Sequence, residues 1–172
     1  VLAAEHLIDD GGLARAAANG RPIFAVCAGF QILGESFHAH GKKTAGLSLI
    51  DATTSPLSSR AIGEVASTPA RKGAASELTQ PLTGFENHMG GTVLGPDAQP
   101  LGRVTRGVGN LDGTAEGVVQ GSVIATYMHG PVLARNPELA DLLLARALGV
   151  DPAELAPLEL DAVDKLRAER LK

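Results

Sequence analysis

One stretch near the start of the chain, PIFAVCAGFQIL at residues 22–33, constrains the fold more than any other. The run that ends at Val26 is apolar and β-prone, which suits a strand buried on both faces of a sheet. Cys27 and Gly29 follow at once, and apolar residues at helical spacing resume over 28–41. A strand, a sharp turn and a helix are half of an α/β unit, and α/β proteins bind ligands at the carboxyl ends of such strands.

The rest of the chain shows both helical and strand patterns. Apolar residues at helical spacing over 1–18 predict a helix that the Gly-Gly pair at 11–12 interrupts or kinks. Over 47–128, short β-prone runs alternate with Gly, Pro and Asn, which predicts strands joined by tight turns, several of them antiparallel. Residues 137–148 predict an amphipathic helix with Pro in its first turn and Gly just past its end. We therefore expect an α/β fold.

The length of 172 residues suits one domain with a single core. We expect residues 1–149 to form that domain. The remaining segment, 150–172, is charged and helical in pattern. A plain surface helix and a contact for a partner protein are both compatible with this tail.

Composition excludes several classes of protein. The net charge of −4 gives no basic field for phosphate backbones, and 3 % aromatic residues give no stacking platform for bases, so we expect no nucleic-acid partner. The single Cys allows no internal disulfide. Apolar runs fall short of the ~20 residues that cross a bilayer, so we expect a cytoplasmic protein without a membrane span.

The position of Cys27 between a strand and a helix is typical of a nucleophile elbow. Amides at the start of the helix, and its dipole, favour thiolate over thiol. The amide of Ala28 can donate to an oxyanion formed when the sulfur attacks a carbonyl carbon, and Gly29 relieves crowding in the turn. A buried structural cysteine is the alternative, because Cys is among the most buried residue types.

A thiolate nucleophile needs a base to move protons, and histidine is best suited to this task near neutral pH. We expect three of the five histidines, His6, His38 and His40, on helix surfaces or at a helix end. His88 and His129 each end a β-like run and precede a glycine turn, which is where catalytic side chains emerge. His129 follows the more convincing buried strand, VIATYM, and is therefore the favoured base.

Three motifs, arriving in the family's order, resemble those of class I (triad-type) glutamine amidotransferase domains. FAVCAGFQILGESF at 24–37 contains the Cys-x-Gly-x-Gln core of that family. GFENHMGGT at 84–92 and IATYMHGPVLARNPELADLLL at 124–144 resemble the cobyric-acid-synthase-like branch, and within it the GatD-type glutaminase subunits. The resemblance covers about residues 1–149 and implies a flavodoxin-like layered sheet with flanking helices.

The resemblance also implies roles for single residues. Cys27 would be the nucleophile and His129 the general base and then the general acid, with Ala28 donating one oxyanion amide. Arg60, in SSRAIGEV, stands roughly where GatD-type subunits have an arginine implicated in holding glutamine, and a guanidinium suits a carboxylate. Further residues of the motifs would border the glutamine pocket, namely Gln31, Asn87, His88 and Gly90.

Two features depart from the family pattern. Ordinary class I domains carry a carboxylate two residues after the histidine, and here Pro131 occupies that position. Glu86, Asp112 and Glu116 are conceivable substitutes, but none is placed by spacing; in GatD-type subunits the acidic member is thought to come from the partner ligase. The family also begins with further strands and a Gly-rich loop that donates the other oxyanion amide, so we expect this chain to lack those N-terminal strands.

The implied function is hydrolysis of the L-glutamine side-chain amide through a Cys27 thioester. The ammonia would pass to a Mur-ligase-like (MurT-type) partner, which would use ATP and Mg²⁺ to amidate the D-glutamate α-carboxyl of lipid II in peptidoglycan synthesis. We expect no cofactor and no metal in this chain. Two alternatives stay open, namely the amidotransferase domain of a cobyric or cobyrinic acid synthase, and a catalytically silent docking subunit of the same fold.

Overall fold

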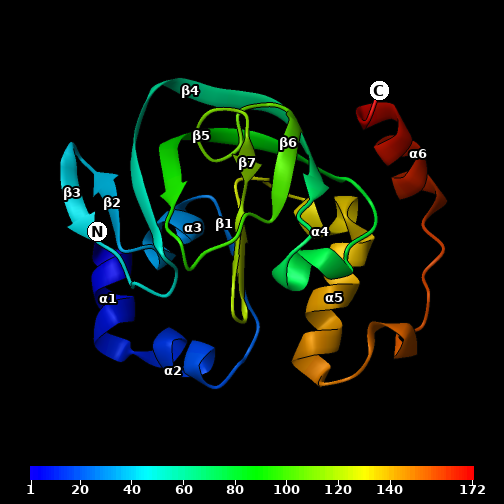
Figure 1. Ribbon diagram of the computed structural model, residues 1–172, viewed down its shortest axis with the longest axis horizontal. Coiled ribbons are helices and arrows are strands. Elements are labelled where there is room, and N and C mark those ends of the chain that lie inside the picture. The colour runs from blue at the N-terminus through cyan, green and yellow to red at the C-terminus, as the bar shows by residue number, and fades with distance from the viewer.

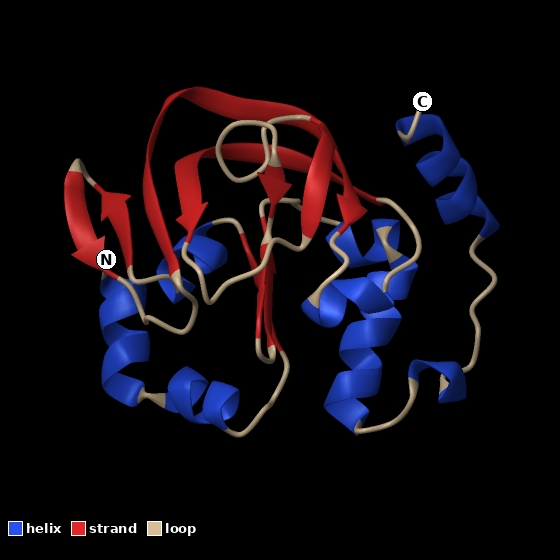
Figure 2. Ribbon diagram, viewed as in Figure 1, coloured by secondary structure: helices blue, strands red, loops and turns tan.

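Two β-sheets and the helices around them make up the fold, in a computed structural model that describes residues 1–172 (Figure 1, Figure 2). The strands are β1 (Ile23–Val26), β2 (Ser36–Ala39), β3 (Lys42–Ala45), β4 (Ala52–Pro69), β5 (Leu82–Leu94), β6 (Gly102–Arg106), β7 (Ala115–Glu116), β8 (Val118–Gln120) and β9 (Val123–Thr126). The helices are α1 (Leu2–Asp10), α2 (Gly12–Ala18), α3 (Ala28–Leu33), α4 (Val132–Arg135), α5 (Pro137–Leu148) and α6 (Asp161–Arg170), with 3-10 turns at Gly73–Glu77 and Pro152–Glu154. The predicted α/β class is confirmed.

The smaller sheet contains the strand that leads to Cys27. Its order is β1-β9-β8, with β1 parallel to β9 and β9 antiparallel to β8. Val26 pairs with Thr126, so the residues that follow the two parallel strands emerge at the same edge of the sheet. The strand prediction for β1 is correct, but its side chains are half-buried and not enclosed on both faces. Cys27 follows β1 and His129 lies just beyond β9, so both predicted catalytic residues lie at this edge of the sheet.

A single helix over residues 28–41 is a wrong prediction. Helix α3 ends at Leu33, and the chain then forms the hairpin of β2 and β3. Gly34 has an extended ψ of −177°, and the next amide, that of Glu35, donates to the carbonyl oxygen of Ala52 at 2.8 Å, so the chain leaves the helix and pairs with β4. Phe37 fits the helical spacing, but it lies in the strand β2, where its side chain is buried.

The other predicted elements are confirmed. The N-terminal helix is split into α1 and α2 at Gly11, whose φ of 63° lies in the left-handed region that favours glycine. Helix α5 has Pro137 at its first turn, and Gly149 follows its end with a φ of 72°. The middle of the chain forms strands with several antiparallel pairs.

The long antiparallel pair of β4 and β5 forms the centre of the larger sheet and supplies most of the site. Its register shifts between Pro56 and Ala61, where β4 bulges away from its partner. Along β5, burial alternates: Glu86 and His88 point inward, and Asn87 is exposed between them. The two faces of β5 therefore carry different chemistry.

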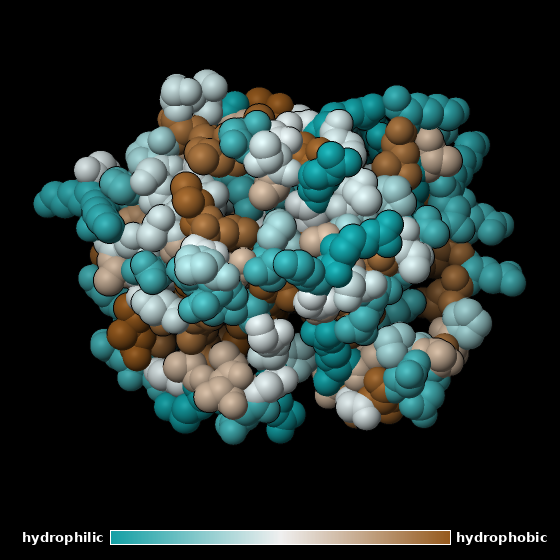
Figure 3. Space-filling view, viewed as in Figure 1, coloured by the Kyte–Doolittle hydropathy of each residue, from teal (hydrophilic) through white to brown (hydrophobic).

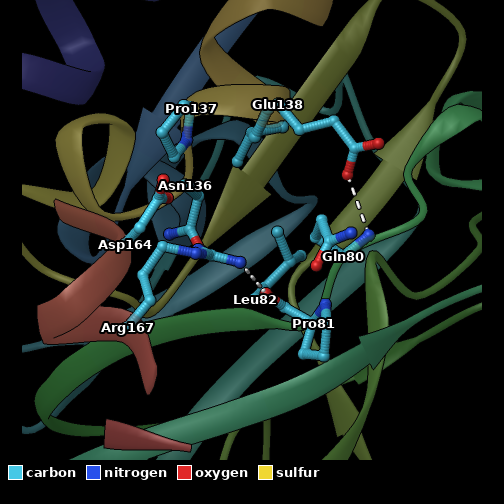
Figure 4. A pocket seen from close by; sticks show the side chains of 9 residues that line it. Gln80, Pro81, Leu82, Asn136, Pro137, Glu138, Asp164 and Arg167 are labelled. Carbon is cyan, nitrogen blue, oxygen red and sulfur yellow. Dashed lines mark hydrogen bonds between the residues drawn. The ribbon is translucent and has the colours of Figure 1, made fainter. Parts of the chain in front are cut away.

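The C-terminal tail ends in α6, whose one buried side chain, Arg167, bonds to the rest of the chain, while Arg106 donates to the carbonyl oxygen of Arg170 at 2.9 Å. The Arg167 guanidinium donates to the carbonyl oxygen of Pro81 (Figure 4). It also donates to the carbonyl oxygen of Arg135 and to Oδ1 of Asn136. Arg167 and Asp164, both on α6, border a cavity of about 220 Å³ (Figure 4). Most other residues of α6 are exposed, as a surface helix requires; a contact with a partner protein stays a prediction.

The face seen in Figure 3 mixes hydrophilic and hydrophobic side chains. Large apolar side chains with substantial exposure occur on several elements, among them Leu2, Ile62, Val93, Leu148 and Leu158. None of the helices is both long enough and apolar enough to cross a lipid bilayer.

Candidate active site

The backbone at Cys27 adopts the sharp turn that the sequence predicts. Its φ is 54° and its ψ is −108°, a combination that costs a non-glycine residue conformational energy and persists only where the surroundings hold it. The N–H of Cys27 donates to the carbonyl oxygen of Thr126 at 2.9 Å, and its own carbonyl accepts from the N–H of Gln31 at 3.2 Å. The cysteine is thus fixed between the end of β1 and the start of α3.

The Cys27 side chain borders a cavity of about 300 Å³. All predicted site residues except His129 line this cavity. The lining comprises Cys27, Ala28, Gln31, His38, Thr54, Ser55, Pro56, Arg60, Asn87, His88, Met89 and Gly90. Residues from α3, β2, β4 and β5 therefore meet around one thiol.

His129 lies just beyond the end of β9 and not in the cavity lining. It forms an isolated antiparallel bridge with Phe85, to whose carbonyl oxygen its backbone N–H donates at 2.8 Å. Its ring Nδ1 lies 3.2 Å from the same oxygen. Since β1 and β9 are parallel and in register, Cys27 and His129 leave the sheet at the same edge, but the lining places only the cysteine in the cavity.

The ionisation of Cys27 differs from the expectation. Burial raises the pKa of its thiol, and the hydrogen bond from the amide of Ala28 opposes that shift without reversing it. Helix α3 has only six residues, so its dipole is short. The amide of Ala28 favours the thiolate as predicted, but burial, which the sequence analysis did not weigh, has the larger effect, so a base must take the proton.

A row of hydrogen-bonded polar side chains joins two residues of the cavity lining, Gln31 and Thr54, through two buried residues outside the lining, Tyr127 and Thr92. The hydroxyl of Tyr127 accepts from Nε2 of Gln31 at 3.3 Å and shares a 2.7 Å hydrogen bond with Oγ1 of Thr92, which in turn lies 2.8 Å from Oγ1 of Thr54. Burial raises the pKa of Tyr127 to about 12, so the phenol stays neutral. A Cβ on Gly90 would lie 2.3 Å from Nε2 of Gln31, which explains the glycine at this position.

The three carboxylates considered as partners of His129 form hydrogen bonds with other groups. Glu86 accepts from the amides of the 108–109 turn, and Glu116 accepts from Oγ1 of Thr126 and the N–H of Tyr127. Asp112 is exposed and accepts from Thr114. None of the ion pairs or hydrogen bonds joins a carboxylate to His129. The acceptor at its Nδ1 is the Phe85 carbonyl.

His38 is a cavity residue that sequence reasoning missed. We expected it on a helix surface, but it lies in β2, lines the cavity, and has Nδ1 3.1 Å from the carbonyl oxygen of Thr54. The error follows from assigning a helix to 28–41, and a strand prediction over 36–39 would have found it. Arg60 lies at the cavity rim, where Nη1 donates to Oδ1 of Asn87 at 2.7 Å.

The fold and this site define a class of protein: an α/β domain with a cysteine elbow at a polar cavity. The family of CobB/CobQ-like glutamine amidotransferase domains matches residues 3–137, and the chain belongs to this family. The sequence-based resemblance to this branch is thereby confirmed.

Among curated proteins, the chain is similar to two GatD subunits of lipid II isoglutaminyl synthase (glutamine-hydrolyzing). The subunit from Streptococcus pneumoniae is 38 % identical over 133 residues, which cover 76 % of this chain and 49 % of the relative. The subunit from Staphylococcus aureus is 32 % identical over 161 residues, which cover 92 % and 63 %. The chain thus spans only part of the length of these relatives.

A probable cobyric acid synthase from Methanothermobacter thermautotrophicus is 32 % identical over 163 residues, which cover 87 % of this chain and 32 % of that protein. Among solved structures, a glutamine amidotransferase superposes with a TM-score of 0.59 at 22 % identity, over 87 % of this chain and 72 % of that one. This structural likeness supports the fold.

Proposed function

We propose that this chain is the glutaminase part of a GatD-type amidotransferase. The observation that carries the proposal is the position of Cys27: a thiol held at a positive φ beside a polar cavity that also contains Gln31, Arg60 and His88. The cavity volume of about 300 Å³ is at the lower end of the range for small-molecule sites and suits one amino acid. Similarity to two GatD subunits adds support.

In the proposed reaction, His129 takes the proton of Cys27 and the sulfur attacks the side-chain amide carbon of L-glutamine. The S–C bond forms, and the amide of Ala28 donates to the resulting oxyanion. The C–N bond then breaks as the His129 imidazolium returns the proton to nitrogen, which leaves as ammonia. Water, deprotonated by His129, attacks the thioester, the C–S bond breaks, and glutamate leaves as the thiol regains its proton.

Because burial raises the pKa of Cys27, His129 must remove the thiol proton in this scheme. An enzyme with a preformed thiolate does not need that step. The Phe85 carbonyl at Nδ1 of His129 selects a tautomer but carries no full negative charge to stabilise the imidazolium. A carboxylate from a partner subunit would supply that charge. The proposal therefore assigns the acidic role to the partner, in place of Glu86, Asp112 or Glu116.

The partner in this proposal is a Mur-ligase-like (MurT-type) subunit that binds ATP and Mg²⁺. It would receive the ammonia and amidate the D-glutamate α-carboxyl of lipid II, a step of peptidoglycan synthesis in the cytoplasm. The names of the GatD relatives support this assignment. Similarity to a probable cobyric acid synthase favours a second candidate, an amidotransferase domain that serves corrinoid amidation.

One experiment separates these functions from a silent docking subunit. The protein is purified as its cell makes it, with and without the ligase that co-purifies, and ammonia release from L-glutamine is measured. The proposal expects release that rises when the ligase is present, and loss of glutamine-dependent amidation in Cys27→Ala while ammonium salts still support amidation. Absence of ammonia in both preparations would establish the docking role, and a corrinoid acceptor would establish the second candidate.

A further inference from the structure

Three titratable side chains lie buried close to one another, one of them in the cavity lining, and the proposed reaction uses none of them to transfer a proton. Glu86 and His88 are on β5, and Glu116 is on β7. Their exposed fractions are 2 %, 3 % and 0 %. Buried ionisable groups are costly unless they are paired, so their protonation states need an explanation.

Both ring nitrogens of His88 face oxygen atoms. Nδ1 lies 2.8 Å from the carbonyl oxygen of Gly90, which can only accept, so Nδ1 carries a proton. Nε2 is buried, has no hydrogen-bond partner, and lies 3.6 Å from Oε2 of Glu86. A neutral ring would therefore direct the lone pair of Nε2 at a carboxylate, whereas a second proton turns the same contact into an ion pair.

The surroundings of Glu86 require it to be ionised. Its two oxygens accept from the amides of Val108 at 2.7 Å and Gly109 at 2.8 Å, both of which are donors only. Burial alone would raise the pKa of Glu86, but the imidazole of His88 and these two amides outweigh it and lower that pKa. A Cβ on Gly107 would lie 2.7 Å from Oε1 of Glu86, so the 107–109 turn is built closely around the carboxylate.

Two other groups lie close to His88, and neither is hydrogen-bonded to its ring. The ring of Tyr127 stacks on His88 with 3.7 Å between centroids and 14° between planes, and its phenol is neutral. Burial raises the pKa of Glu116 to about 7, so this carboxyl keeps its proton below neutrality. Below about pH 7, Glu86 is therefore the single full negative charge beside His88 in the cluster, and above that pH ionised Glu116 adds a second one that also favours the imidazolium.

We propose that Glu86 holds His88 as an imidazolium, which places a fixed positive charge in the wall of the cavity beside Cys27. Such a charge attracts the α-carboxylate of an amino acid, together with Arg60 at the rim. Glu86 is a positioning residue in this scheme because it acts only through His88. The identity of the ligand rests on the proposed glutaminase function, whereas the ion pair does not.

The protonation state of His88 is measured directly by ¹⁵N NMR of the histidine side chains in the intact protein. The signal that disappears in His88→Gln identifies the residue among the five histidines. The proposal expects both ring nitrogens of His88 to carry a proton at about pH 7, whereas a neutral imidazole carries only one. A ring with one unprotonated nitrogen at pH 7 would overturn the ion pair, and this measurement needs no other variant to fold.

Glu86→Gln tests the link to binding. Removal of the carboxylate should leave one ring nitrogen of His88 unprotonated at about pH 7, and the KM for glutamine should rise about 10-fold while kcat changes little. Glu116→Gln is the matched control, a neutral replacement in the same cluster that should leave both ring nitrogens of His88 protonated at about pH 7. A neutral His88 with an unchanged KM would overturn the binding role, and absence of glutamine hydrolysis in the unmodified protein would count against the proposed function alone.

Discussion

The ring Nδ1 of His129 lies 3.2 Å from the carbonyl oxygen of Phe85, the same oxygen that accepts the backbone N–H of His129 at 2.8 Å. A carbonyl only accepts, so the ring carries its proton on Nδ1 and leaves Nε2 free as a base. Strand β5 thus orients a residue that follows β9, and a backbone oxygen fixes the tautomer as a carboxylate does in ordinary triads, but without the negative charge that stabilises the imidazolium.

Replacement of the proposed base gives the first prediction. His129→Gln should lower kcat for glutamine hydrolysis by at least about 100-fold, with little change in KM, because only proton transfer is lost. His6→Gln, at an exposed position of α1, is the control and should leave kcat unchanged. Steady-state ammonia release measures both. Retention of most of kcat in His129→Gln would remove His129 from the mechanism and direct attention to His38 or His88 in the cavity lining.

The second prediction concerns the wall beside Gly90. Gly90→Ala introduces a methyl group 2.3 Å from Nε2 of Gln31 and 2.8 Å from Cγ2 of Thr54, so Gln31 must leave its hydrogen bond with Tyr127. We expect the affinity for glutamine to fall by about 10-fold, measured as KM or by calorimetry. Ser59→Ala, an exposed change on β4, is the comparison and should bind normally. Equal affinities would show that this wall does not contact the ligand.

The third prediction is a dependence of stability on pH. Burial raises the pKa of Glu116 from its ordinary value of 4.5 to about 7 in the folded chain. The unfolded chain therefore releases this proton first as pH rises, and the contribution of Glu116 to stability is fully present below pH 4.5 and is lost between 4.5 and about 7. Glu116→Gln cannot ionise, so its stability relative to the unmodified protein should rise across this window by up to about 3 kcal/mol.

Urea unfolding of both proteins at pH 5 and pH 7.5 measures this effect, because all other groups are common to the two. Gln can retain the bonds that Oε1 accepts from Thr126 and Tyr127, since only the unpartnered Oε2 is exchanged. A stability difference that is the same at both pH values would mean that Glu116 ionises alike in the folded and unfolded chains.

The fourth prediction concerns the attachment of the tail. Arg167→Ala removes the buried guanidinium that holds α6 against Pro81 and Asn136, and should cost about 1–3 kcal/mol and speed proteolysis within 150–160. Arg170 is the matched control: its side chain is 50 % exposed and lies 3.9 Å from Glu64, so Arg170→Ala should change stability little. Equal protease sensitivity of the two variants would contradict the anchoring role of Arg167.

Much of the fold could be predicted because strong local signals agree with the packing. The elbow at Cys27, the break near Gly11 and the boundaries of α5 all follow from turn and cap residues that act locally. The assignment of a helix to 28–41 failed because three apolar residues at helical spacing also fit a short helix followed by a strand. What separates the two is the hydrogen bond from the amide of Glu35 to the carbonyl oxygen of Ala52, which is not visible in a local pattern.

The candidate site was predictable in its residue types but not in its electrostatics. The elbow geometry followed from the sequence around Cys27, whereas the raised pKa of its thiol depends on burial by segments distant in the chain. The pairing of Glu86 with His88 follows from strand alternation, but the turn at 107–109 that fixes Glu86 is a tertiary contact. His38 was not among the candidates because the strand that contains it, β2, was predicted as part of a helix.

The most direct test of the account is covalent labelling of Cys27 by a glutamine analogue that carries a diazoketone in place of the side-chain amide. The analogue can react only after it binds as glutamine and meets an activated nucleophile. Peptide mass spectrometry of the intact protein should find one adduct, on Cys27, that excess L-glutamine prevents and that is absent from His129→Gln over the same time. An unlabelled Cys27, or labelling that L-glutamine does not slow, would contradict the glutaminase assignment.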